Sequence, residues 1–329
     1  MTQKIYDKAY EDRLFACFQE NLPEKIYDAH FHISRAFAAA CGYPGEPYQQ
    51  YSQFMEKYLG RKMSGGLVMP QPSRRHTMAD VDNENAYNLE ICEKHNLQAG
   101  LIITPACGRA KTESLLDKYP QIRALKPYLT YSVKENEFES DITDFAPEWM
   151  WALANDHEMP MILHLSHYRD MLSDESNLRQ INELCAKYPK MKLILAHCAM
   201  GHHSMKLKWG LERIKGIQNI WFDCSGSAEA MSIYYCLQAF GPEKMMYGGD
   251  FDHAYTVGRI VSFGSNFLGL HNGYVNEDSL YEGYKYEPLN NGQECLLALL
   301  QAMELTNLDR QAREDIFYGN AARMFGVQS

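Results

Sequence analysis

The chain lacks long apolar runs and basic clusters, although it has 329 residues. Nowhere do about 18 apolar residues follow one another, so it contains no candidate membrane-spanning helix. Residues 1–20 are polar and mixed in charge, unlike a signal peptide. We therefore expect a cytoplasmic protein that is neither exported nor anchored. The formal net charge of −10, without any Lys/Arg run, argues against binding to nucleic acid or to an anionic membrane.

Paired cysteines are also missing. The nine cysteines are scattered, odd in number and never spaced as Cys-x-x-Cys, which argues against a disulfide framework and a structural zinc cluster. We expect reduced thiols. A zinc-dependent nucleic-acid deaminase would also need a His-x-Glu element, which the chain does not contain. An open doubly wound sheet would usually carry a glycine-rich turn after its first strand, but residues 30–35 read His-Phe-His-Ile-Ser-Arg.

What the chain does contain is an alternation of short β-rich runs and longer runs with helical spacing. Eight runs have strand character: 25–30, 66–69, 98–103, 122–129, 161–165, 192–197, 219–224 and 244–248. Helical spacing is clear at 83–95 and 177–188. Eight such units predict an α/β fold, a single (β/α)8 TIM barrel domain over residues 1–329. We expect a loop insertion over the barrel mouth after strand eight, at 255–293, and C-terminal closing helices at 294–303, 309–317 and 320–325.

Two histidines, His30 and His32, stand at the end of the first strand run. Residues two apart on a strand point to the same side, so both imidazoles can bind one metal ion; histidines that only pack or hydrogen-bond are the alternative. Similar residues occur where later runs end, namely His164 at the fifth, His197 at the sixth and Asp250 at the eighth. Because barrels keep their chemistry at the C-terminal ends of the strands, we expect these five residues to form one site.

This ordered set resembles the amidohydrolase superfamily of metal-dependent barrels, and most of all its amidohydrolase 2 branch, over residues 26–325. The resemblance implies that His30, His32, His164 and Asp250 are the metal ligands. It also implies that His197 stands beside the metal and acts on the substrate. Imidazole and carboxylate ligands suit one divalent ion, Zn²⁺ first, with Mn²⁺ or Fe²⁺ as alternatives.

The expected chemistry follows from such a site. A divalent ion lowers the pKa of bound water to ~7 and polarises a carbonyl group. Asp250 is then the expected general base, which later returns the proton to the leaving group. His197 is expected to polarise the scissile carbonyl or to shuttle a proton. We therefore predict that Asp250 and His197 are the catalytic residues.

Lys126, in the fourth strand run, allows a second interpretation. Two-metal amidohydrolases carry a carboxylated lysine at a fourth-strand position, and in that case His164 and His197 would both bind a second ion. The overall pattern is nearer the one-metal branch, in which a fourth-strand lysine commonly binds substrate. We therefore expect one ion, and a metal content near two per chain would contradict this.

Cationic residues follow consecutive strand runs, although the chain is acidic overall. Any one of them alone would be an ordinary solvated charge, but as a group they favour a substrate with one or more carboxylates. They are Arg35, Arg74, Arg75, His76, Arg109 and Lys126. Other residues just beyond strand ends are expected to line the pocket, namely Tyr128, His167 and His253, together with Tyr131, His202 and His203.

We therefore expect a metal-dependent hydrolase that acts on a small lactone or amide. Non-oxidative decarboxylation of an aromatic or unsaturated acid, and hydration, stay open because closely similar sites in the branch perform them. A barrel that binds metal without turnover is a further alternative, but no catalytic ligand is missing. The expected partner is a small-molecule substrate, and because barrels of this branch are often homodimers, the resemblance leaves a homodimer open.

Overall fold

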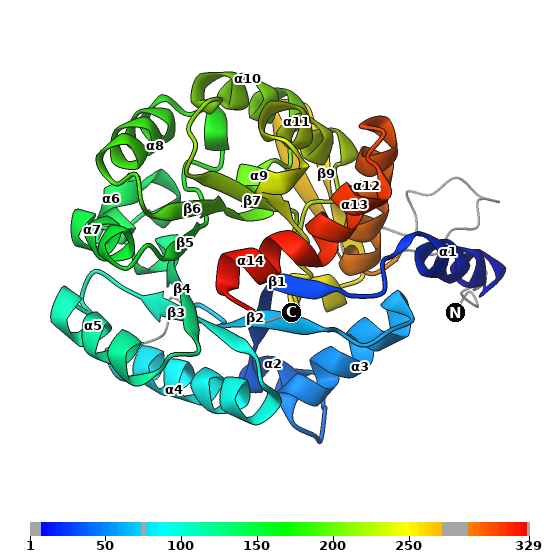
Figure 1. Cartoon of the computed structure of the whole chain (residues 1–329), viewed down its shortest axis with the longest axis horizontal. Coiled ribbons are helices and arrows are strands. Elements are labelled where there is room, and N and C mark those ends of the chain that lie inside the picture. Colours follow the sequence, from blue (N-terminus) through cyan, green and yellow to red (C-terminus); the bar gives the residue numbers. More distant parts are fainter. Residues whose placement is uncertain (1–7, 74–76, 272–288, 328–329) are drawn as a thin grey trace.

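A computed structural model describes residues 8–73, 77–271 and 289–327 of the chain. Within them, eight parallel strands form one sheet in chain order (Figure 1). Their bounds are β1 Tyr27–Ile33, β2 Gly65–Pro70, β3 Gln98–Ile103, β4 Ile122–Pro127, β5 Pro160–Leu163, β6 Lys192–Leu195, β7 Ile220–Asp223 and β8 Met245–Met246. The N–H of Ala29 in β1 donates to the carbonyl of Tyr247, after β8, at 2.9 Å. The sheet is therefore a nearly closed barrel, and the predicted (β/α)8 architecture is confirmed.

Helices cover the outside of the barrel (Figure 1). Before and between the strands they are α1 Lys8–Asn21, α2 Arg35–Ala40, α3 Pro47–Leu59, α4 Met78–His95, α5 Arg109–Lys118, α6 Ile142–Phe145, α7 Glu148–Asp156, α8 Glu175–Lys187, α9 Ala196–Met200, α10 Ser204–Ile214 and α11 Ala230–Phe240. After β8 come α12 Asn291–Leu305, α13 Arg310–Glu314, the π-helical turn η7 Asp315–Gly319 and α14 Asn320–Phe325. Among the described residues, no helix combines the length and apolar character needed to cross a membrane.

Local sequence signals explain where the long helices begin and end. At the start of α4, Thr77 Oγ1 accepts the N–H of Asp80, and the Asp80 carboxylate accepts the N–H of Thr77 at 2.8 Å. Asn96, in the left-handed conformation with φ 53°, ends the helix. In α8 the carboxylate of Asp174 caps the first turn, and the buried face includes the apolar positions Leu178, Ile181, Leu184 and Cys185, spaced three and four apart.

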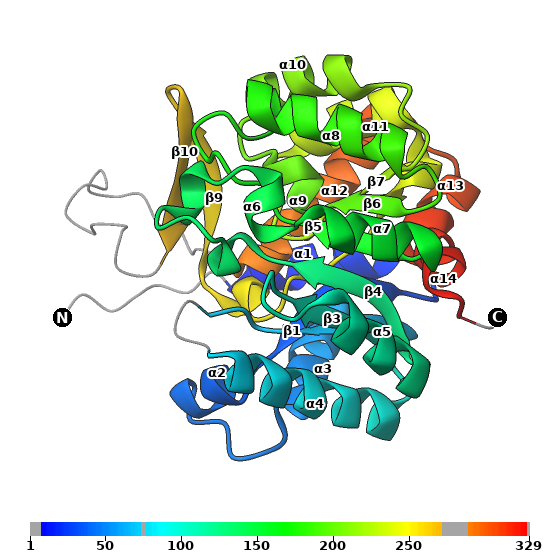
Figure 2. The ribbon, with the colours of Figure 1, turned by 90° about the vertical axis from the view of Figure 1, so that its left-hand side faces the viewer.

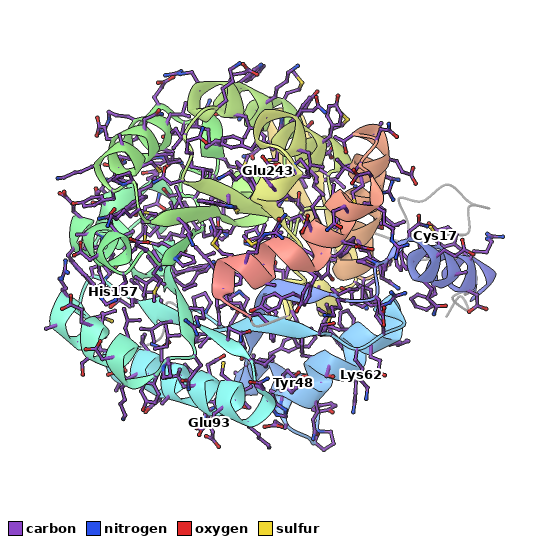
Figure 3. All side chains as sticks on the ribbon, in the orientation of Figure 1. Cys17, Tyr48, Lys62, Glu93, His157 and Glu243 are labelled. Carbon is purple, nitrogen blue, oxygen red and sulfur yellow. The ribbon has the colours of Figure 1, made fainter. Side chains whose placement is uncertain are left out.

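Apolar side chains form two layers, one between the strands and the outer helices and one inside the barrel. The inner layer joins residues of six strands, among them Tyr27, to Ala321 and Phe325 of α14. The rings of Tyr27 and Phe325 stack with centroids 5.8 Å apart. Helix α14 therefore closes the N-terminal end of the barrel, and Figure 1 shows it lying across the barrel. Outer charged side chains such as Glu93 on α4 point to solvent (Figure 3).

The predicted insertion after strand eight contains an antiparallel hairpin, β9 Gly258–Phe263 and β10 Asn266–His271. Figure 2 shows this hairpin at the end of the molecule opposite α14. The hydroxyl of Ser262 in β9 donates to the carbonyl of His202 at 2.8 Å, which fastens the hairpin to the segment before α10. Residues 272–288 of the predicted insertion lie outside the described residues, and α12 begins at Asn291, inside the predicted range.

Only β3 has the predicted bounds, and for three of the other seven strands the structure shows the reason for the difference. Strand β6 ends before His197 because residues 197–200 adopt left-handed backbone conformations. Strand β8 is short because the N–H of Tyr247 donates to the carbonyl of Ile316 in η7, at 2.9 Å, and not to a neighbouring strand. Strand β1 continues to Ile33, which pairs with Pro70, so the two first-strand histidines lie within the strand and not at its end.

Candidate functional site

A register shift in β1 turns its two histidines toward the barrel interior. Ala29 belongs to the inner apolar layer, and strict alternation would then send His30 and His32 outward. The pairing of β1 with β2 shifts between Asp28 and Phe31, as at a β-bulge. Phe31 consequently packs in the outer layer, while both imidazoles face the carboxylate that follows β8.

Each of these two histidines is oriented through its Nδ1 atom. Nδ1 of His30 lies 3.0 Å from Oδ2 of Asp223, and Nδ1 of His32 lies 3.0 Å from the carbonyl oxygen of Pro70. Burial raises the pKa of Asp223, but the imidazole of His30 opposes this effect. The net pKa of this carboxyl group lies below its ordinary value, so the group is ionised. Burial lowers the pKa of His32 to about 3 and also lowers that of His30. In both neutral rings Nδ1 therefore donates, and the lone pair is on Nε2.

Asp250 faces both Nε2 atoms. Its Oδ1 lies 3.9 Å from Nε2 of His30 and 3.9 Å from Nε2 of His32. Its Oδ2 lies 3.9 Å from Nδ1 of His197. Burial raises the pKa of Asp250, but the imidazoles of His197 and His30 bring it below the ordinary value, so the carboxylate is charged. Two imidazole nitrogens and one carboxylate oxygen thus lie within 4.8 Å of one another in a buried cluster.

This cluster fits a divalent metal ion. Nε2 of His30 is buried and has no hydrogen-bond partner among the described residues. A bare lone pair in a protein interior is unfavourable unless a donor or a cation meets it. Imidazole nitrogens whose other ring nitrogen donates to a carboxylate or a carbonyl are the usual arrangement of metal ligands. His30, His32 and Asp250 therefore have the chemistry needed to hold an ion.

His197 is fixed by a strained turn after β6. Its φ and ψ are 56° and 43°, and the next three residues are also left-handed, a conformation that costs roughly 1–2 kcal/mol per non-glycine residue. Its N–H donates to Oδ1 of Asp223 at 3.1 Å, and its Nδ1 lies 2.9 Å from the carbonyl oxygen of Ser225. Its ring centroid is 4.9 Å from that of His30 and 5.2 Å from that of His164. The strain thus brings this imidazole into the cluster.

His164, the first residue after β5, stands at the edge of the cluster. Neither of the metal-competent groups found among the described residues includes it. Its Nδ1 lies 3.3 Å from the carbonyl oxygen of Leu165, and the hydroxyl of Tyr168 lies 3.4 Å from each ring nitrogen. Tyr128, a predicted pocket residue, packs beside it with centroids 5.0 Å apart. Burial lowers the pKa of His164 well below its ordinary value, so it is neutral, the form that binds metals.

Lys126 places a cation inside the barrel. It is fully buried in β4, and its Nζ has no hydrogen-bond partner among the described residues. Burial lowers its pKa to about 8, against the opposing influence of Asp223 and Asp250. Nζ lies 5.4 Å from the centroid of the Tyr128 ring. The ammonium group is therefore available to an anionic group that enters the barrel.

The predicted loop arginines do not join this cluster. Nη2 of Arg35 lies 2.7 Å from Oε1 of Glu84, and Nη2 of Arg109 lies 2.6 Å from Oδ2 of Asp156. Both are partly exposed surface pairs, so carboxylates of the same chain already occupy these guanidinium groups. Arg74, Arg75 and His76 lie outside the described residues. Of the predicted cations that the structure describes, Lys126 alone is inside the barrel.

Two other predicted pocket residues hold loops. His167 is half-buried between two carboxylates, 3.8 Å from Oδ1 of Asp141 and 3.9 Å from Oδ2 of Asp174. The hydroxyl of Tyr131 accepts the N–H of Ser73 at 3.3 Å. Neither contact involves a residue of the metal-competent cluster.

Three histidines lie near the hairpin or the carboxylate after β8. The ring of His202 packs against Phe267 of β10 with centroids 4.8 Å apart, and burial lowers its pKa to about 3. Nε2 of His203 donates to the carbonyl of Gly264 in the hairpin turn at 3.2 Å. His253 begins a 3₁₀ turn, His253–Tyr255, and is close enough to Asp250 to lower its pKa. Of the three, His253 and His202 border the site, and His203 fastens the hairpin.

Sequence reasoning missed two buried aspartates. Asp223 is the last residue of β7, so the strand-end rule that selected Asp250 could have found it. Asp28 stands two residues before His30 and accepts backbone N–H bonds from His30 and Gly249. Burial raises the pKa of Asp28 to about 7, although these two hydrogen bonds lower it. Its position two residues before His30 of the His-x-His motif was the feature of the sequence that could have identified it.

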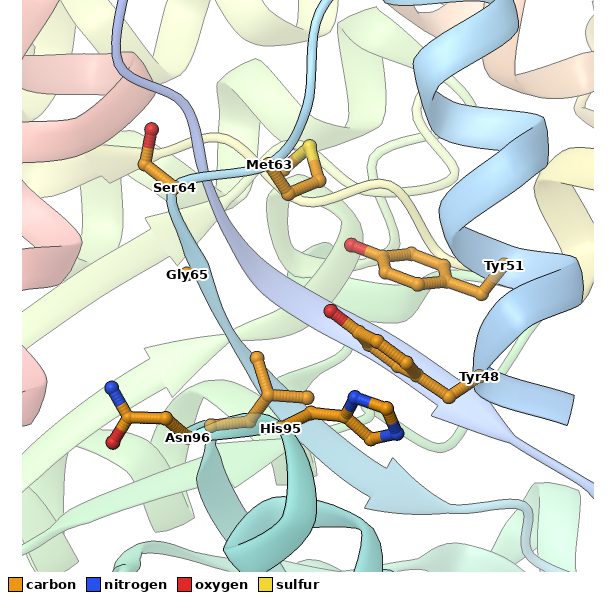
Figure 4. Close-up of a pocket in the computed structure, with 8 residues that line it drawn as sticks. Tyr48, Tyr51, Met63, Ser64, Gly65, His95 and Asn96 are labelled. Carbon is orange, nitrogen blue, oxygen red and sulfur yellow. The ribbon is translucent and has the colours of Figure 1, made fainter. Parts of the chain in front are cut away.

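A separate cavity of about 140 Å³ lies outside the barrel, beside α3 and the end of α4 (Figure 4). Its lining residues are Tyr48, Tyr51, Met63, Ser64, Gly65, His95, Asn96 and Leu97, and none belongs to the cluster. His95 is already engaged, with Nε2 3.0 Å from Oε2 of Glu46 and its ring 4.1 Å from that of Tyr48. The cavity is therefore not the place where the metal-competent residues meet.

Comparisons with known proteins agree with this fold. A zinc-bound amidohydrolase structure from Burkholderia multivorans is 13% identical, with a TM-score of 0.61, covering 92% of this chain and 100% of that one. The structure of 4-oxalomesaconate hydratase from Rhodopseudomonas palustris is 15% identical, with a TM-score of 0.58, and the match covers 92% of this chain and 95% of that one. The structure of 5-carboxyvanillate decarboxylase from Sphingomonas paucimobilis is 11% identical, with a TM-score of 0.57, and the match covers 93% of this chain and 100% of that one.

At these identities the solved structures establish the fold alone. The comparison with curated proteins found no match. A family model described as Amidohydrolase matches residues 136–327, which is more than half of the chain. The chain therefore belongs to the amidohydrolase family.

Proposed function

We propose that the chain is a metal-dependent hydrolase that acts on a small carboxylate-bearing lactone or amide. One divalent ion would be held by His30, His32 and Asp250, with His164 as the fourth ligand. The observation that carries the proposal is the convergence of the Nε2 atoms of His30 and His32 on Oδ1 of Asp250, each at 3.9 Å. The ligand set suits Zn²⁺, Mn²⁺ or Fe²⁺, and the zinc in the Burkholderia multivorans structure favours Zn²⁺.

When bound, a divalent ion supplies Lewis-acid polarisation and lowers the pKa of water that it contacts to ~7. Asp250 has distinct surroundings for its two oxygens, because Oδ1 faces the first-strand imidazoles and Oδ2 faces His197. Oδ2 is thus placed to hold a proton during the reaction and to pass it on. In His197, Nδ1 donates to the carbonyl of Ser225, which leaves the Nε2 lone pair to exchange a proton with the substrate.

Lys126 supports the choice of a carboxylate-bearing substrate. A buried ammonium group without a hydrogen-bond partner is costly in an apolar interior unless an anion meets it. A substrate carboxylate near this group would gain a charge-assisted hydrogen bond. The proposal therefore assigns substrate recognition to Lys126 and does not use Arg35 or Arg109.

Non-oxidative decarboxylation is a second candidate function. The unpaired Lys126 favours it too, because a buried cation can hold the carboxylate that reacts as well as one that only anchors the substrate. The structurally similar 5-carboxyvanillate decarboxylase and 2,6-dihydroxybenzoate decarboxylase carry out reactions of this class on the same barrel fold.

Metal analysis and product analysis together test the proposal. Purified protein should retain about one divalent ion per chain, and the double variant His30→Ala/His32→Ala should retain little. A screen of lactones, amides and aromatic carboxylic acids in ¹⁸O-labelled water then separates the reactions. Hydrolysis places the label in the organic product, whereas decarboxylation releases carbon dioxide and leaves the organic product unlabelled. Failure of the wild-type protein to bind any divalent ion would contradict both candidates.

A further inference from the structure

One carboxylate joins the two segments that carry the proposed ligands. Oδ1 of Asp28 accepts the N–H of His30 at 3.0 Å and the N–H of Gly249 at 2.8 Å. Its Oδ2 accepts the hydroxyl of Tyr51 at 3.0 Å. His30 is itself a proposed ligand, and Gly249 directly precedes the other, Asp250. A single oxygen atom therefore links the ligand segment of β1 to the ligand segment after β8.

These two backbone N–H groups need that oxygen. The register of β1 shifts at this point, so the strand ladder does not supply an acceptor for the N–H of His30. A buried N–H left without an acceptor costs about 1–3 kcal/mol. Space is tight as well, because a Cβ atom on Gly249 would lie 2.5 Å from Oδ2 of Asp28. The glycine lets the segment after β8 approach the carboxylate closely enough for the shared bond.

We propose that Asp28, supported by Tyr51, is a positioning residue of the metal centre, which sets the spacing between His30 and Asp250 and thereby the affinity for the ion. This inference rests on the proposed function, because it takes His30 and Asp250 as ligands. Asp28 acts through the backbone: its side chain bonds to the N–H groups beside the ligand atoms and not to the ligand atoms themselves. The bond from the N–H of Asp250 to the carbonyl of His30, at 2.7 Å, completes the connection.

Tyr51 completes the support from the side of α3. Its ring stacks on Phe31, at the end of the register shift, with centroids 4.1 Å apart and planes 10° apart. Its other surroundings include the cavity beside α3 (Figure 4), so solid packing does not enclose the ring on every side. The hydroxyl bond to Oδ2 is thus what ties the orientation of the Asp28 carboxylate to α3.

The geometry also says which substitutions separate position from charge. Asn at position 28 keeps one carbonyl oxygen with two lone pairs, enough for both N–H groups, but loses the charge. Ala keeps neither. If Asp28 acts by position, Asp28→Asn should retain more metal affinity than Asp28→Ala. If it acted by its charge, the two variants would lose equal affinity.

The test measures zinc affinity of the metal-free chain at one fixed pH, by competition with a chromophoric chelator, with the Co²⁺ absorption spectrum as a second readout of ligand geometry. We expect Asp28→Ala to weaken binding by about 10–100-fold, and Tyr51→Phe and Asp28→Asn by less. Tyr58→Phe is the matched control, because it removes another buried tyrosine hydroxyl from α3, one that bonds to Tyr247 at 2.8 Å and not to Asp28. It should leave affinity and spectrum unchanged.

The outcomes distinguish this inference from the proposed function. If the wild type binds zinc and Asp28→Ala binds it equally well, the inference is wrong and the proposed metal site stands. If the wild type binds no better than His30→Ala/His32→Ala, the proposed function itself fails. Should Asp28→Ala not fold, the comparison of Tyr51→Phe with Tyr58→Phe decides, since equal affinities would overturn the role of the Asp28 network.

Discussion

His30 donates its Nδ1 proton to Asp223 across 3.0 Å, and both side chains are buried. The other oxygen of Asp223 accepts the backbone N–H of His197 at 3.1 Å. One carboxylate at the end of β7 therefore orients a proposed ligand from β1 and a proposed catalytic imidazole after β6. This arrangement fixes the tautomer of His30 and leaves its Nε2 lone pair for an ion.

The first prediction concerns this pair. In Asp223→Asn the amide nitrogen offers a donor where one of the two partners needs an acceptor, so either the imidazole of His30 or the N–H of His197 loses its bond. We expect zinc affinity to fall by about 10–100-fold in a chain that still folds. Chelator competition measures the affinity, and Asp174→Asn, which alters the cap of α8, is the control. Unchanged affinity in Asp223→Asn would show that Asp223 does not orient a metal ligand.

A second prediction concerns Asp250. Asp250→Asn preserves the size of the side chain but removes the group that can hold a proton between the imidazoles. We expect turnover to fall by about 10²–10⁴-fold while near-ultraviolet circular dichroism shows a native fold. The rate should be measured with the substrate found in the screen, at saturating metal, so that weaker metal binding does not account for the loss. A folded, fully active Asp250→Asn protein would rule out the proposed role.

The barrel could be predicted because its information is local. Apolar runs about six residues long alternate with helical spacing, and the run at 98–103 coincides with β3. Strand ends depend on distant contacts and were less predictable. The N–H of Tyr247 donates to the carbonyl of Ile316, and the sequence around residue 247 does not predict this contact. The sequence around β1 likewise does not reveal that Asp28, beside the register shift, accepts the N–H of Gly249, 221 residues away.

The site was predictable to the extent that strand ends meet at one end of a barrel. That rule brought together His30, His32 and Asp250, which the structure places around one point. It could not tell which cations turn inward. Arg35 pairs with Glu84, 49 residues away, so its charge is neutralised by a contact that the sequence does not reveal. Lys126 differs because it sits in the strand itself, with apolar neighbours that carry it into the interior.

A third prediction follows from the pKa of Lys126, which burial lowers from 10.5 to about 8. Between these pH values the unfolded chain holds a proton that the folded chain does not, so stability rises with pH across this window. The destabilisation by the buried charge of Lys126 is fully present below pH 8 and disappears above the pKa that this lysine has in the unfolded chain. Removing this charge with Lys126→Met should therefore raise the free energy of unfolding above that of the wild type by about 3 kcal/mol at pH 7, but by only about 1 kcal/mol at pH 10.

Urea unfolding of the metal-free proteins at the two pH values measures this difference. The comparison between pH values cancels the packing change that methionine introduces, because packing does not depend on the protonation of residue 126. Lys111→Met is the control, since Lys111 is an exposed residue paired with Asp82 at 2.6 Å. A stability difference for Lys126→Met that is the same at both pH values would contradict a buried, charge-destabilised ammonium group.

The fourth prediction concerns Gly226, which has a φ of +61°. A Cβ atom there would lie 2.8 Å from Oδ2 of Asp250 and 3.1 Å from Nδ1 of His197. Gly226→Ala would therefore combine two effects, a left-handed backbone that costs about 1 kcal/mol or more for alanine and a methyl group pressed between two proposed catalytic groups. Gly42→Ala separates the two, because Gly42 has a φ of +66° but no atom within 4 Å of the added Cβ.

We expect both alanine variants to lower the free energy of unfolding, and Gly226→Ala alone to reduce turnover. The methyl group displaces the Oδ2 side of Asp250, whereas the proposed ligand atoms face Oδ1. Zinc affinity should consequently fall less than the turnover rate in Gly226→Ala. Urea unfolding, chelator competition and steady-state rates on the two variants measure these three quantities. Normal turnover in a folded Gly226→Ala protein would mean that Oδ2 of Asp250 and the imidazole of His197 do not act together in the reaction.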